Sequence, residues 1–316
     1  MKPLNILFLG GAKRVSLAES FIQSGREHGF NVSIFSYEMD KNVPISFIGK
    51  IIIGKRWSAP DVLEHIEETV IRENIHIVLA SVDPGTVVAA NFKKYTKTNC
   101  FVPTPDTDLC TIFFHKQLTY DWALKNNIPV PGADIRFPMI AKPVNGSASV
   151  GICKLPDQKA FEEFKATHTL SAYNLQQFID GIEYSVDCYV SARTGKMIVA
   201  VPRIRLEVLG GESIKSVTVR DENIIDLSRQ LIEKSGLIGP LTIQFIQDKL
   251  TKTNYLMEVN PRFGGAVMCS IGAGADIPGM LIRDWIGENL AEENSIWKSN
   301  ILMVRRFTEF YREYNP

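Results

Sequence analysis

The stretch that decides the fold is Glu258-Val259-Asn260-Pro261-Arg262-Phe263-Gly264-Gly265. Its first residue ends an apolar run over 253–258, and a second apolar run over 239–247 precedes it across a polar turn. This pattern predicts two neighbouring strands, with Gln244 and Glu258 side by side and Asn260 just past the second strand. One carboxylate and two side-chain amides form an all-oxygen ligand set, which suits Mg²⁺ bound together with substrate phosphates.

Arg262 lies two residues beyond Asn260, where its guanidinium can present a fork of donors to a phosphate group. The same stretch could instead be a turn after an edge strand, with its polar side chains in solvent. We favour a metal and phosphate site, because further phosphate-binding features precede this stretch in a workable order.

The composition limits the class of protein. With 316 residues, of which 45% are hydrophobic, the chain can form about two domains, or one domain with several lobes. Its 35 Lys and Arg balance its 35 Asp and Glu, so a general nucleic-acid or membrane surface is not expected. No apolar run reaches the roughly 18 residues of a membrane span, and the short apolar N-terminus does not resemble a signal peptide. The five scattered cysteines indicate neither a disulfide framework nor a zinc site, and the expected location is the cytoplasm.

Residues 1–103 alternate between strand and helix patterns, which predicts βαβ units and a parallel sheet. The predicted strands are 6–9, 32–36, 50–53, 76–80 and 100–102, and the predicted helices are 14–28, 60–73 and 84–95. The segment Gly10-Gly11-Ala12-Lys13-Arg14 follows the first strand but lacks the full G-x-G-x-x-G series. We therefore expect its glycines to permit close packing of strand and helix rather than to bind a dinucleotide.

A linker, Pro103-Thr104-Pro105-Asp106, separates this part from a mixed α/β region. Helices are predicted at 115–126, from Asp157 to about 166, and at 222–235, with Asp157 as an N-cap and Gly236 as a C-cap. Strands are predicted at 138–142, 150–155, 174–179, 183–190, 197–204 and 214–219.

Two lysines lie where a phosphate could bind. Lys142 ends a predicted strand and precedes a loop of small residues, in which Gly146, Ser147 and Ser149 let backbone N–H groups approach a phosphate. Lys116 lies at the start of a predicted helix, where backbone donors and the helix dipole also favour an anion. Either feature alone is more often a surface lysine or a turn, but the two in this order indicate a nucleotide site.

The next candidate is the segment that contains Gln176, Gln177, Phe178 and Ile179. An extended backbone there could present free N–H and C=O groups to the edge of adenine, with Phe178 and Ile179 as apolar walls. Glu183 could accept hydrogen bonds from ribose hydroxyls. By itself the segment is more typical of an ordinary hairpin with Glu183 in solvent.

Together these residues resemble the ATP-grasp superfamily. The series Gln244…Glu258-Val259-Asn260-Pro261-Arg262, with its separation of fourteen residues from Gln244 to Glu258, is most similar to the branch of the carbamoyl-phosphate synthetase large subunit. The resemblance covers nearly the whole chain and implies an α/β ATP-grasp fold. It implies a Rossmann-like pre-ATP-grasp domain at 1–103, a linker helix and small α+β lid at 104–177, and a C-terminal α+β lobe with the metal site at 178–316.

The resemblance also implies a role for each candidate residue. Phosphate-binding lysines are matched by Lys116 and Lys142, the adenine hinge by Gln176, Gln177, Phe178 and Ile179, and the ribose-binding acid by Glu183. Magnesium ligands are matched by Gln244, Glu258 and Asn260, and an arginine near the transferred phosphate by Arg262. We therefore expect ATP and Mg²⁺, with Mn²⁺ as a substitute. The chain departs from the family at His115, where aspartate is usual, and in the hinge, where a glutamate is common.

The reaction that the resemblance implies is transfer of the γ-phosphate of ATP to a carboxylate. An amine or ammonia then attacks the acyl phosphate, and ADP and phosphate are released. The expected partners are thus a small-molecule carboxylate and an amine, and a homodimer is compatible with the sequence. A phosphotransferase on the same fold and a non-catalytic nucleotide-binding regulatory protein are the alternatives.

The carboxylate site is less clearly marked. Arg203 and Arg205 alternate along a predicted strand, so both would point to one face, where they could hold a carboxylate and act in catalysis with Arg262. A solvated edge strand with Glu207 as a partner is an equally good interpretation, and 210–213 is expected to be a flexible loop. Ser81-Val82-Asp83-Pro84 follows a parallel strand and is a weaker candidate for a ligand contact.

Overall fold

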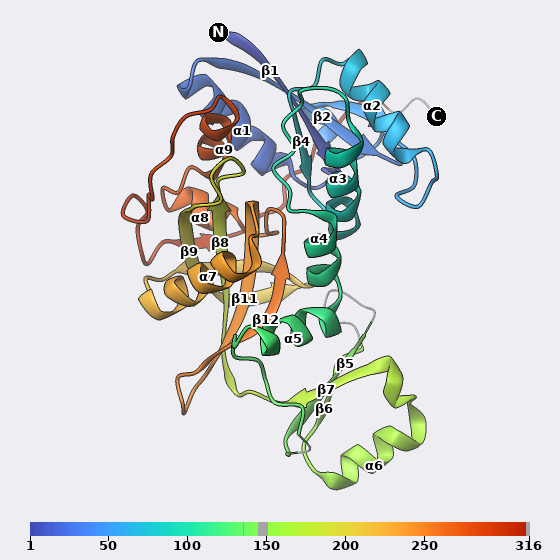
Figure 1. Ribbon diagram of the computed structural model, residues 1–316, viewed down its shortest axis with the longest axis vertical. Coiled ribbons are helices and arrows are strands. Elements are labelled where there is room, and N and C mark those ends of the chain that lie inside the picture. The colour runs from blue at the N-terminus through green and yellow to red at the C-terminus, as the bar shows by residue number, and fades with distance from the viewer. Residues whose placement is uncertain (135, 145–150, 314–316) are drawn as a thin grey trace.

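The computed structural model describes residues 1–134, 136–144 and 151–313. Its strands form three sheets, which define an N-terminal lobe, a small lid and a C-terminal lobe (Figure 1). The two larger lobes lie against each other, and the lid projects from them beyond helices α4 (Thr107–Phe114) and α5 (Lys116–Lys125). Among the described residues, no helix has the length and apolar character needed to cross a membrane.

The N-terminal lobe contains a parallel sheet of order β3-β2-β1-β4. Its elements are β1 (Lys2–Leu9), α1 (Val15–Glu27), β2 (Phe30–Glu38), the short 3-10 helix η1 (Pro44–Phe47), β3 (Lys50–Ile53), α2 (Val62–Arg72), β4 (Ile77–Ala80) and α3 (Asp83–Tyr95). The parallel sheet confirms the predicted βαβ pattern. The strand predicted at 100–102 is wrong: Phe101 forms only an isolated bridge with Ile77, because Pro103 has no N–H to continue the ladder.

Two helices, rather than the one predicted, connect the N-terminal lobe to the lid. The prediction at 115–126 corresponds to α5, and α4, which buries Cys110 and Phe113, was missed. The backbone of His115 is extended between the two helices, with φ of −102° and ψ of 116°. The chain therefore turns at His115, and Lys116 becomes the first residue of a new helix.

The lid is a three-stranded sheet of order β6-β5-β7 covered by one helix. Its elements are β5 (Met139–Pro143), β6 (Cys153–Leu155), α6 (Gln158–Thr167), the short 3-10 helix η2 (Leu170–Ala172) and β7 (Tyr173–Gln177). Asp157 caps α6 as predicted, since its side chain accepts a hydrogen bond of 2.8 Å from the N–H of Ala160.

The C-terminal lobe contains an antiparallel sheet of order β12-β11-β8-β9-β10-β13. Its elements are β8 (Gly181–Val190), β9 (Met197–Leu209), β10 (Glu212–Thr218), α7 (Glu222–Ser235), β11 (Gly239–Asp248), β12 (Asn254–Asn260), α8 (Met268–Gly272), α9 (Ile277–Trp285) and β13 (Leu302–Val304). Helix α7 ends at Gly236 with φ of 72°, which confirms the predicted C-cap.

The structure corrects two expectations for 203–213. Strand β9 lies between β8 and β10, so Arg203 and Arg205 do not lie on a solvated edge strand. The expected flexible loop is a tight turn at Gly210 and Gly211, whose φ values are 57° and 80°. Glu212 already belongs to β10, which places its side chain on a fixed strand.

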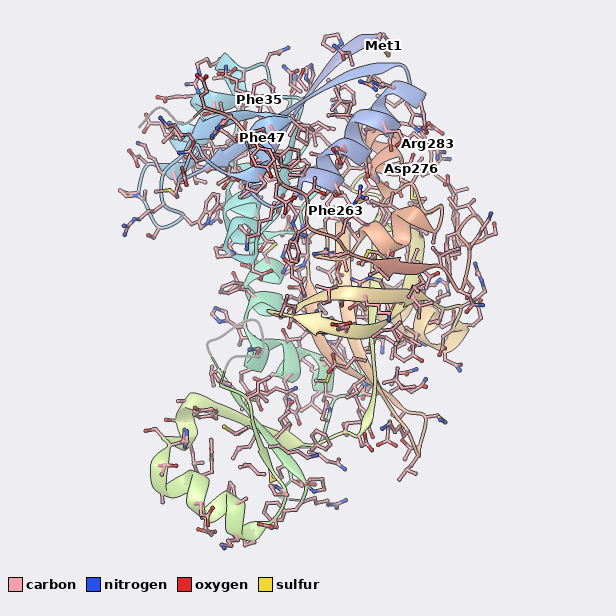
Figure 2. All side chains as sticks on the ribbon, turned by 180° about the vertical axis from the view of Figure 1, so that it is seen from behind. Met1, Phe35, Phe47, Phe263, Asp276 and Arg283 are labelled. Carbon is pink, nitrogen blue, oxygen red and sulfur yellow. The ribbon has the colours of Figure 1, made fainter. Side chains whose placement is uncertain are left out.

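The N-terminal and C-terminal lobes share one hydrophobic core. Phe263, labelled in Figure 2, lies just after β12 and packs edge-on against Phe21 of α1. Phe21 packs in the same way against Phe8 of β1, with ring centroids 5.7 Å apart in each pair. The lid has its own core, in which Phe161 and Phe164 of α6 cover the sheet. The core of the lid is thus separate from the core that the two lobes share.

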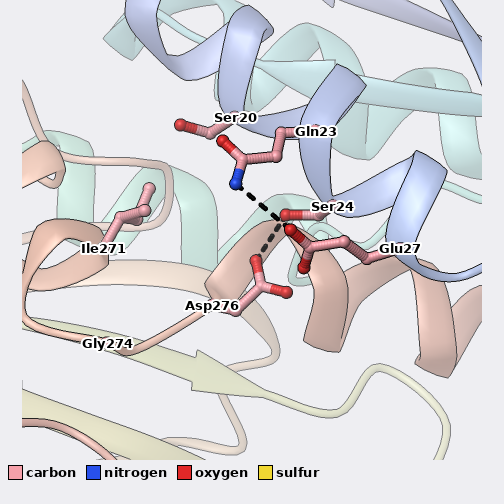
Figure 3. A pocket seen from close by; sticks show the side chains of 7 residues that line it. All are labelled: Ser20, Gln23, Ser24, Glu27, Ile271, Gly274 and Asp276. Carbon is pink, nitrogen blue, oxygen red and sulfur yellow. Dashed lines mark hydrogen bonds between the residues drawn. The ribbon is translucent and has the colours of Figure 1, made fainter.

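A cavity of about 160 Å³ lies at the junction of the lobes, between α1 and the segment from α8 to α9 (Figure 3). Ser24 donates a hydrogen bond of 2.5 Å to Asp276, whose side chain also caps α9 by accepting from the N–H of Gly279 at 3.0 Å. The polar groups around this small cavity thus fasten the lobes to each other, and the candidate site lies elsewhere.

Candidate active site

A cavity of about 860 Å³ extends between the lid and the two lobes. All predicted site residues that the structure describes line it: Lys116, Lys142, Gln176, Gln177, Phe178, Ile179, Glu183, Arg203, Arg205, Gln244, Glu258, Asn260 and Arg262. The predicted residues Gly146, Ser147 and Ser149 lie outside the described part of the chain. Residues that are far apart in the sequence thus meet around one space.

Strands β11 and β12 place the three predicted magnesium ligands together. Gln244 pairs directly with Glu258, and Asn260 lies two residues further along β12, on the same face of the sheet. The Nδ2 atom of Asn260 donates a hydrogen bond of 2.7 Å to Oε1 of Glu258. A bulge after Gln244 interrupts the strand pairing, a feature that is common next to active sites.

This donor set contains one carboxylate, from Glu258, and two amide oxygens. In the described ranges, no group of three or more His, Cys, Asp or Glu side chains is placed to hold a metal ion by itself. Mg²⁺ usually keeps several waters and binds one or two carboxylates together with substrate phosphates. The residues therefore fit Mg²⁺ in the company of a nucleotide, whose phosphates would complete the coordination.

Arg262 connects the predicted metal ligands to the N-terminal lobe. Its Nη2 donates to Oδ1 of Asn260 at 3.1 Å, and its Nε donates to Oδ1 of Asp83, the first residue of α3, at 2.5 Å. Asp83 and Pro84 also line the cavity, so part of the weaker candidate segment 81–84 is located there. Arg262 thus lies between the predicted metal ligands and the far end of the cavity.

Arg205 contacts residues that were predicted to bind different parts of the nucleotide. Its Nη1 donates to Oε2 of Glu183 at 3.0 Å and to Oε1 of Gln244 at 3.1 Å. Its Nε donates to Ser213 at 3.1 Å, and its Nη2 donates to the carbonyl of Gly211 at 2.9 Å. These bonds hold its positive charge beside the predicted ribose and metal positions.

Arg203 is held in a different way from Arg205. The residue is only 2% exposed, and its Nε and Nη2 donate to the two oxygens of Asp187 at 2.8 and 3.4 Å. Asp187 also accepts from Thr242 at 2.9 Å and from Ser270 at 2.7 Å. A guanidinium fixed by a buried carboxylate has little freedom to follow a substrate, so this geometry favours a structural role for Arg203 over the predicted catalytic one.

Removal of the Asp187 carboxylate is expected to destabilise the protein. Asp187→Ala leaves the Arg203 charge buried without its partner, which should lower the free energy of unfolding by about 3–5 kcal/mol. Chemical denaturation measures this loss. Asp226→Ala is the matched control, because it removes an exposed ion pair with Arg229 and should cost under about 1 kcal/mol. Equal losses in the two variants would contradict the structural role.

Lys142 and Lys116 lie near enough to influence each other. Burial and, next, the positive charge of Lys116 lower the pKa of Lys142 from 10.5 to about 8, against the opposing charges of Glu183 and Glu258. Lys142 lies on β5 of the lid, paired with Asn174 of β7. A lysine that has lost hydration beside a second cation favours an anionic ligand such as a phosphate.

The predicted adenine hinge connects β7 to β8, but part of its backbone is already bonded. The N–H of Gln177 donates to the carbonyl of Gly132 at 2.7 Å, and that of Phe178 donates to Pro138 at 2.9 Å. The expectation of free N–H groups at these two residues is therefore wrong. Ile179 is 6% exposed, and the Lys154 ammonium lies 3.8 Å from the centroid of the Phe178 ring.

A protein-family model described as "ATP-grasp in the biosynthetic pathway with Ter operon" matches residues 170–310. The biotin carboxylase domain of Hydrogenobacter thermophilus 2-oxoglutarate carboxylase, in complex with MgADP, ADP and bicarbonate, superposes with a TM-score of 0.72. The alignment covers 94% of this chain and 73% of that chain, at 15% identity. The chain has the ATP-grasp fold.

Other structures share this ATP-grasp architecture. L-amino acid ligase from Bacillus licheniformis gives a TM-score of 0.69 at 16% identity, over 92% of this chain and 76% of that chain. N5-carboxyaminoimidazole synthetase from Staphylococcus aureus, complexed with ADP, gives 0.71 at 14% identity, over 92% of this chain and 80% of that chain. No curated protein matches the chain in sequence. Likeness at these identities establishes the fold.

Among the cavity residues that sequence reasoning missed are Arg14 and Glu212. Arg14 follows the loop after β1, and the glycines of that loop do pack closely, since a Cβ on Gly11 would approach Ser36 Oγ to 2.6 Å. The position of Arg14 after a parallel strand could have indicated a ligand contact, as the same position did for the segment that contains Asp83. Glu212 could not be placed while 210–213 was taken to be flexible.

Proposed function

We propose that this protein is an ATP- and Mg²⁺-dependent carboxylate–amine ligase that acts through an acyl phosphate. The observation that carries the proposal is the meeting of two lysines, an oxygen ligand set and Arg262 around one cavity. Two structures with the same fold are complexes with ADP or MgADP, which supports the nucleotide assignment. The resemblance to the carbamoyl-phosphate synthetase branch remains part of the proposal, with ammonia among the nucleophiles.

The cavity residues divide between the parts of the nucleotide. The adenine would lie beside Phe178 and Ile179, and Glu183 would accept from the ribose hydroxyls through its second oxygen, because Arg205 bonds only Oε2. Lys116 and Lys142 would bind the triphosphate. Mg²⁺ or Mn²⁺, held by Gln244, Glu258 and Asn260, would neutralise charge on the phosphates.

The chain's own residues would then assist an in-line transfer. A carboxylate oxygen of the acceptor attacks the γ-phosphorus, the bond from that phosphorus to the β–γ bridging oxygen breaks, and ADP leaves. The nitrogen of the amine attacks the acyl carbon and loses its proton, and inorganic phosphate departs. Arg262 can stabilise negative charge on the transferring group, because its guanidinium lies beside Asn260 at the predicted phosphate position.

The acceptor side of the cavity favours a ligase over a phosphotransferase. An alcohol acceptor needs a general base, whereas a carboxylate is already ionised at pH 7. Asp83 and Glu212 each bond an arginine, Arg262 at 2.5 Å and Arg305 at 2.7 Å. Although burial raises the pKa of Glu212, the bond from Arg305 and the charge of Arg14 outweigh burial and lower it, which makes Glu212 a poor base. A non-catalytic regulatory protein would not need both lysines and the metal ligands.

An isotope experiment tests the reaction. ADP release is first screened over small carboxylates, with and without amines, to find an acceptor. Oxygen-18 in the carboxylate of that acceptor is expected to appear in the released phosphate, because one carboxylate oxygen becomes the bridging oxygen of the acyl phosphate. Mass spectrometry of the phosphate measures the label. AMP and pyrophosphate as products, unlabelled phosphate or a stable phosphoester would contradict the proposed reaction.

A further inference from the structure

One end of the cavity is formed by both lobes. We call it the acceptor end and define it by Arg14 and Asp83 of the N-terminal lobe and Glu212, Arg262 and Gly265 of the C-terminal lobe. Arg262 bonds Asn260 on one side and Asp83 on the other, so this end adjoins the predicted metal and phosphate position. A molecule that accepts the γ-phosphate must therefore contact it.

Arg14 reaches across the junction of the lobes. Its Nη1 donates to the carbonyl of Gly264 at 3.2 Å, and its Nη2 donates to the carbonyls of Ser81 at 3.1 Å and Phe263 at 3.5 Å. These carbonyls belong to both lobes and hold the guanidinium in place. A guanidinium has five N–H groups, so donors remain for a ligand in the cavity.

Arg14 lies near Asp83 and Glu212, but among the described residues it forms no direct ion pair. Arg262 pairs with Asp83, Arg205 with Glu183 and Arg305 with Glu212. Within the described ranges, no carboxylate lies within ion-pair distance of Arg14. Burial and, next, the charge of Arg262 lower the pKa of Arg14 to about 10, against the opposing charges of Glu212 and Asp83, and Arg14 stays protonated at neutral pH. A partly buried cation that lacks a direct ion pair and lies near a second cation favours an anionic ligand.

Two carboxylates, of Asp83 and Glu212, lie beside these cations and can still accept hydrogen bonds. Arg262 uses Oδ1 of Asp83, and Arg305 uses Oε2 of Glu212, while an ionised carboxylate offers about four lone-pair sites. Glu212 lies against the backbone at Gly265, where an added Cβ would come within 3.0 Å of its Cδ atom. The acceptor end therefore offers guanidinium donors and carboxylate acceptors at short range from one another.

We propose that the acceptor end binds an amino acid, whose carboxylate contacts Arg14 and Arg262 and whose ammonium group contacts Asp83 and Glu212. This arrangement presents the carboxylate to the γ-phosphate and keeps the ammonium group away from it. The inference rests on the proposed ligase function and specifies its substrate class. It also assigns a substrate contact to the N-terminal lobe, which makes that lobe part of the site.

The test compares amino acids with the same acids lacking the ammonium group. The intact protein, MgATP and hydroxylamine as a general nucleophile are assayed for ADP release with the twenty proteinogenic amino acids, and with deaminated partners such as propionate for alanine and glutarate for glutamate. We expect at least one amino acid to have a KM at least about 10-fold below that of its partner, because its ammonium group gains a charged hydrogen bond. Asp83→Asn combined with Glu212→Gln should remove this preference.

The Arg14→Gln variant tests the anion contact. The KM for the amino acid should rise at least about 10-fold, while the KM for ATP stays within about twofold. Arg14→Lys should restore part of the affinity, since it keeps the charge. Arg193→Gln is the matched control, because Arg193 also donates to two backbone carbonyls but does not line the cavity. Thermal unfolding of each variant establishes that it is folded.

Three other outcomes of these experiments would contradict the amino-acid assignment, the role of Arg14 or the ligase proposal. If deaminated acids serve as well as amino acids, or if Arg14→Gln leaves the acceptor KM unchanged, the amino-acid assignment is wrong and the ligase proposal stands. If Arg14→Gln and Arg193→Gln raise the acceptor KM equally, Arg14 has no specific contact with the substrate. If no acid of either kind accelerates ADP release, the ligase proposal fails, and this inference fails with it.

Discussion

Turnover of the Glu258→Gln variant is expected to fall by at least about 100-fold while the protein remains folded. Glu258 supplies the only carboxylate among the three predicted magnesium ligands, and its Oε1 accepts a hydrogen bond from Asn260 at 2.7 Å. Glutamine keeps the shape and an oxygen that can accept this bond, but it removes the negative charge that attracts a divalent cation. The loss should therefore affect turnover far more than stability.

Steady-state ADP release, titrated with Mg²⁺ at saturating ATP, measures the effect. We expect a higher Mg²⁺ requirement together with the lower turnover, because the weakened site must be filled from solution. Glu207→Gln is the matched control, since Glu207 lies on β9 of the same sheet but does not line the cavity. Wild-type turnover and an unchanged Mg²⁺ requirement in Glu258→Gln would remove Glu258 from the proposed metal site.

The Glu258 site could be predicted because its geometry is local. Strands β11 and β12 are joined by a short polar turn, and such a hairpin fixes its own register. Alternation along β12 places Glu258 and Asn260 on one face, and the bulge after Gln244 brings Glu258, rather than Met257, opposite Gln244. Lys142 could be predicted for a similar reason, because a strand end followed by small residues is a local pattern.

The acceptor end could not be predicted in the same way. The bond from Arg14 to Gly264 joins residues 250 positions apart, and its existence depends on how two lobes share one core. The sequence also did not predict that Arg203 and Arg205 lie in different environments. Their alternation suggested equal roles, but the partner of Arg203, Asp187, comes from the neighbouring strand β8. Long-range packing, rather than local propensity, decides such contacts.

The hinge shows a further limit of sequence reasoning. The pattern around Phe178 indicated an extended segment, and the structure has one between β7 and β8. Whether its N–H groups are free depends on other parts of the lid, and the carbonyls of Gly132 and Pro138 accept two of them. Backbone donors must be paired when they are buried, so the partner can come from any segment that packs nearby.

Affinity for MgATP is expected to fall as the pH rises through about 8, because Lys142 then loses its proton. Burial and the charge of Lys116 lower the pKa of Lys142 to about 8, and only the protonated lysine attracts a phosphate. A group with this pKa is about nine-tenths protonated at pH ~7 and about one-tenth protonated at pH ~9. The Kd for MgATP should therefore rise about 10-fold over this interval.

Two substitutions separate this titration from other effects of pH. Lys142→Arg keeps a positive charge at every pH in the interval, so its Kd should change by less than about twofold. Lys142→Ala removes the charge altogether, and its Kd should be raised at least about 10-fold already at pH ~7, with a similarly flat profile. Isothermal titration calorimetry with MgATP measures all three proteins. A steep rise in Kd that persists in Lys142→Arg would show that another group titrates, and an unchanged affinity in Lys142→Ala would place Lys142 outside the nucleotide site.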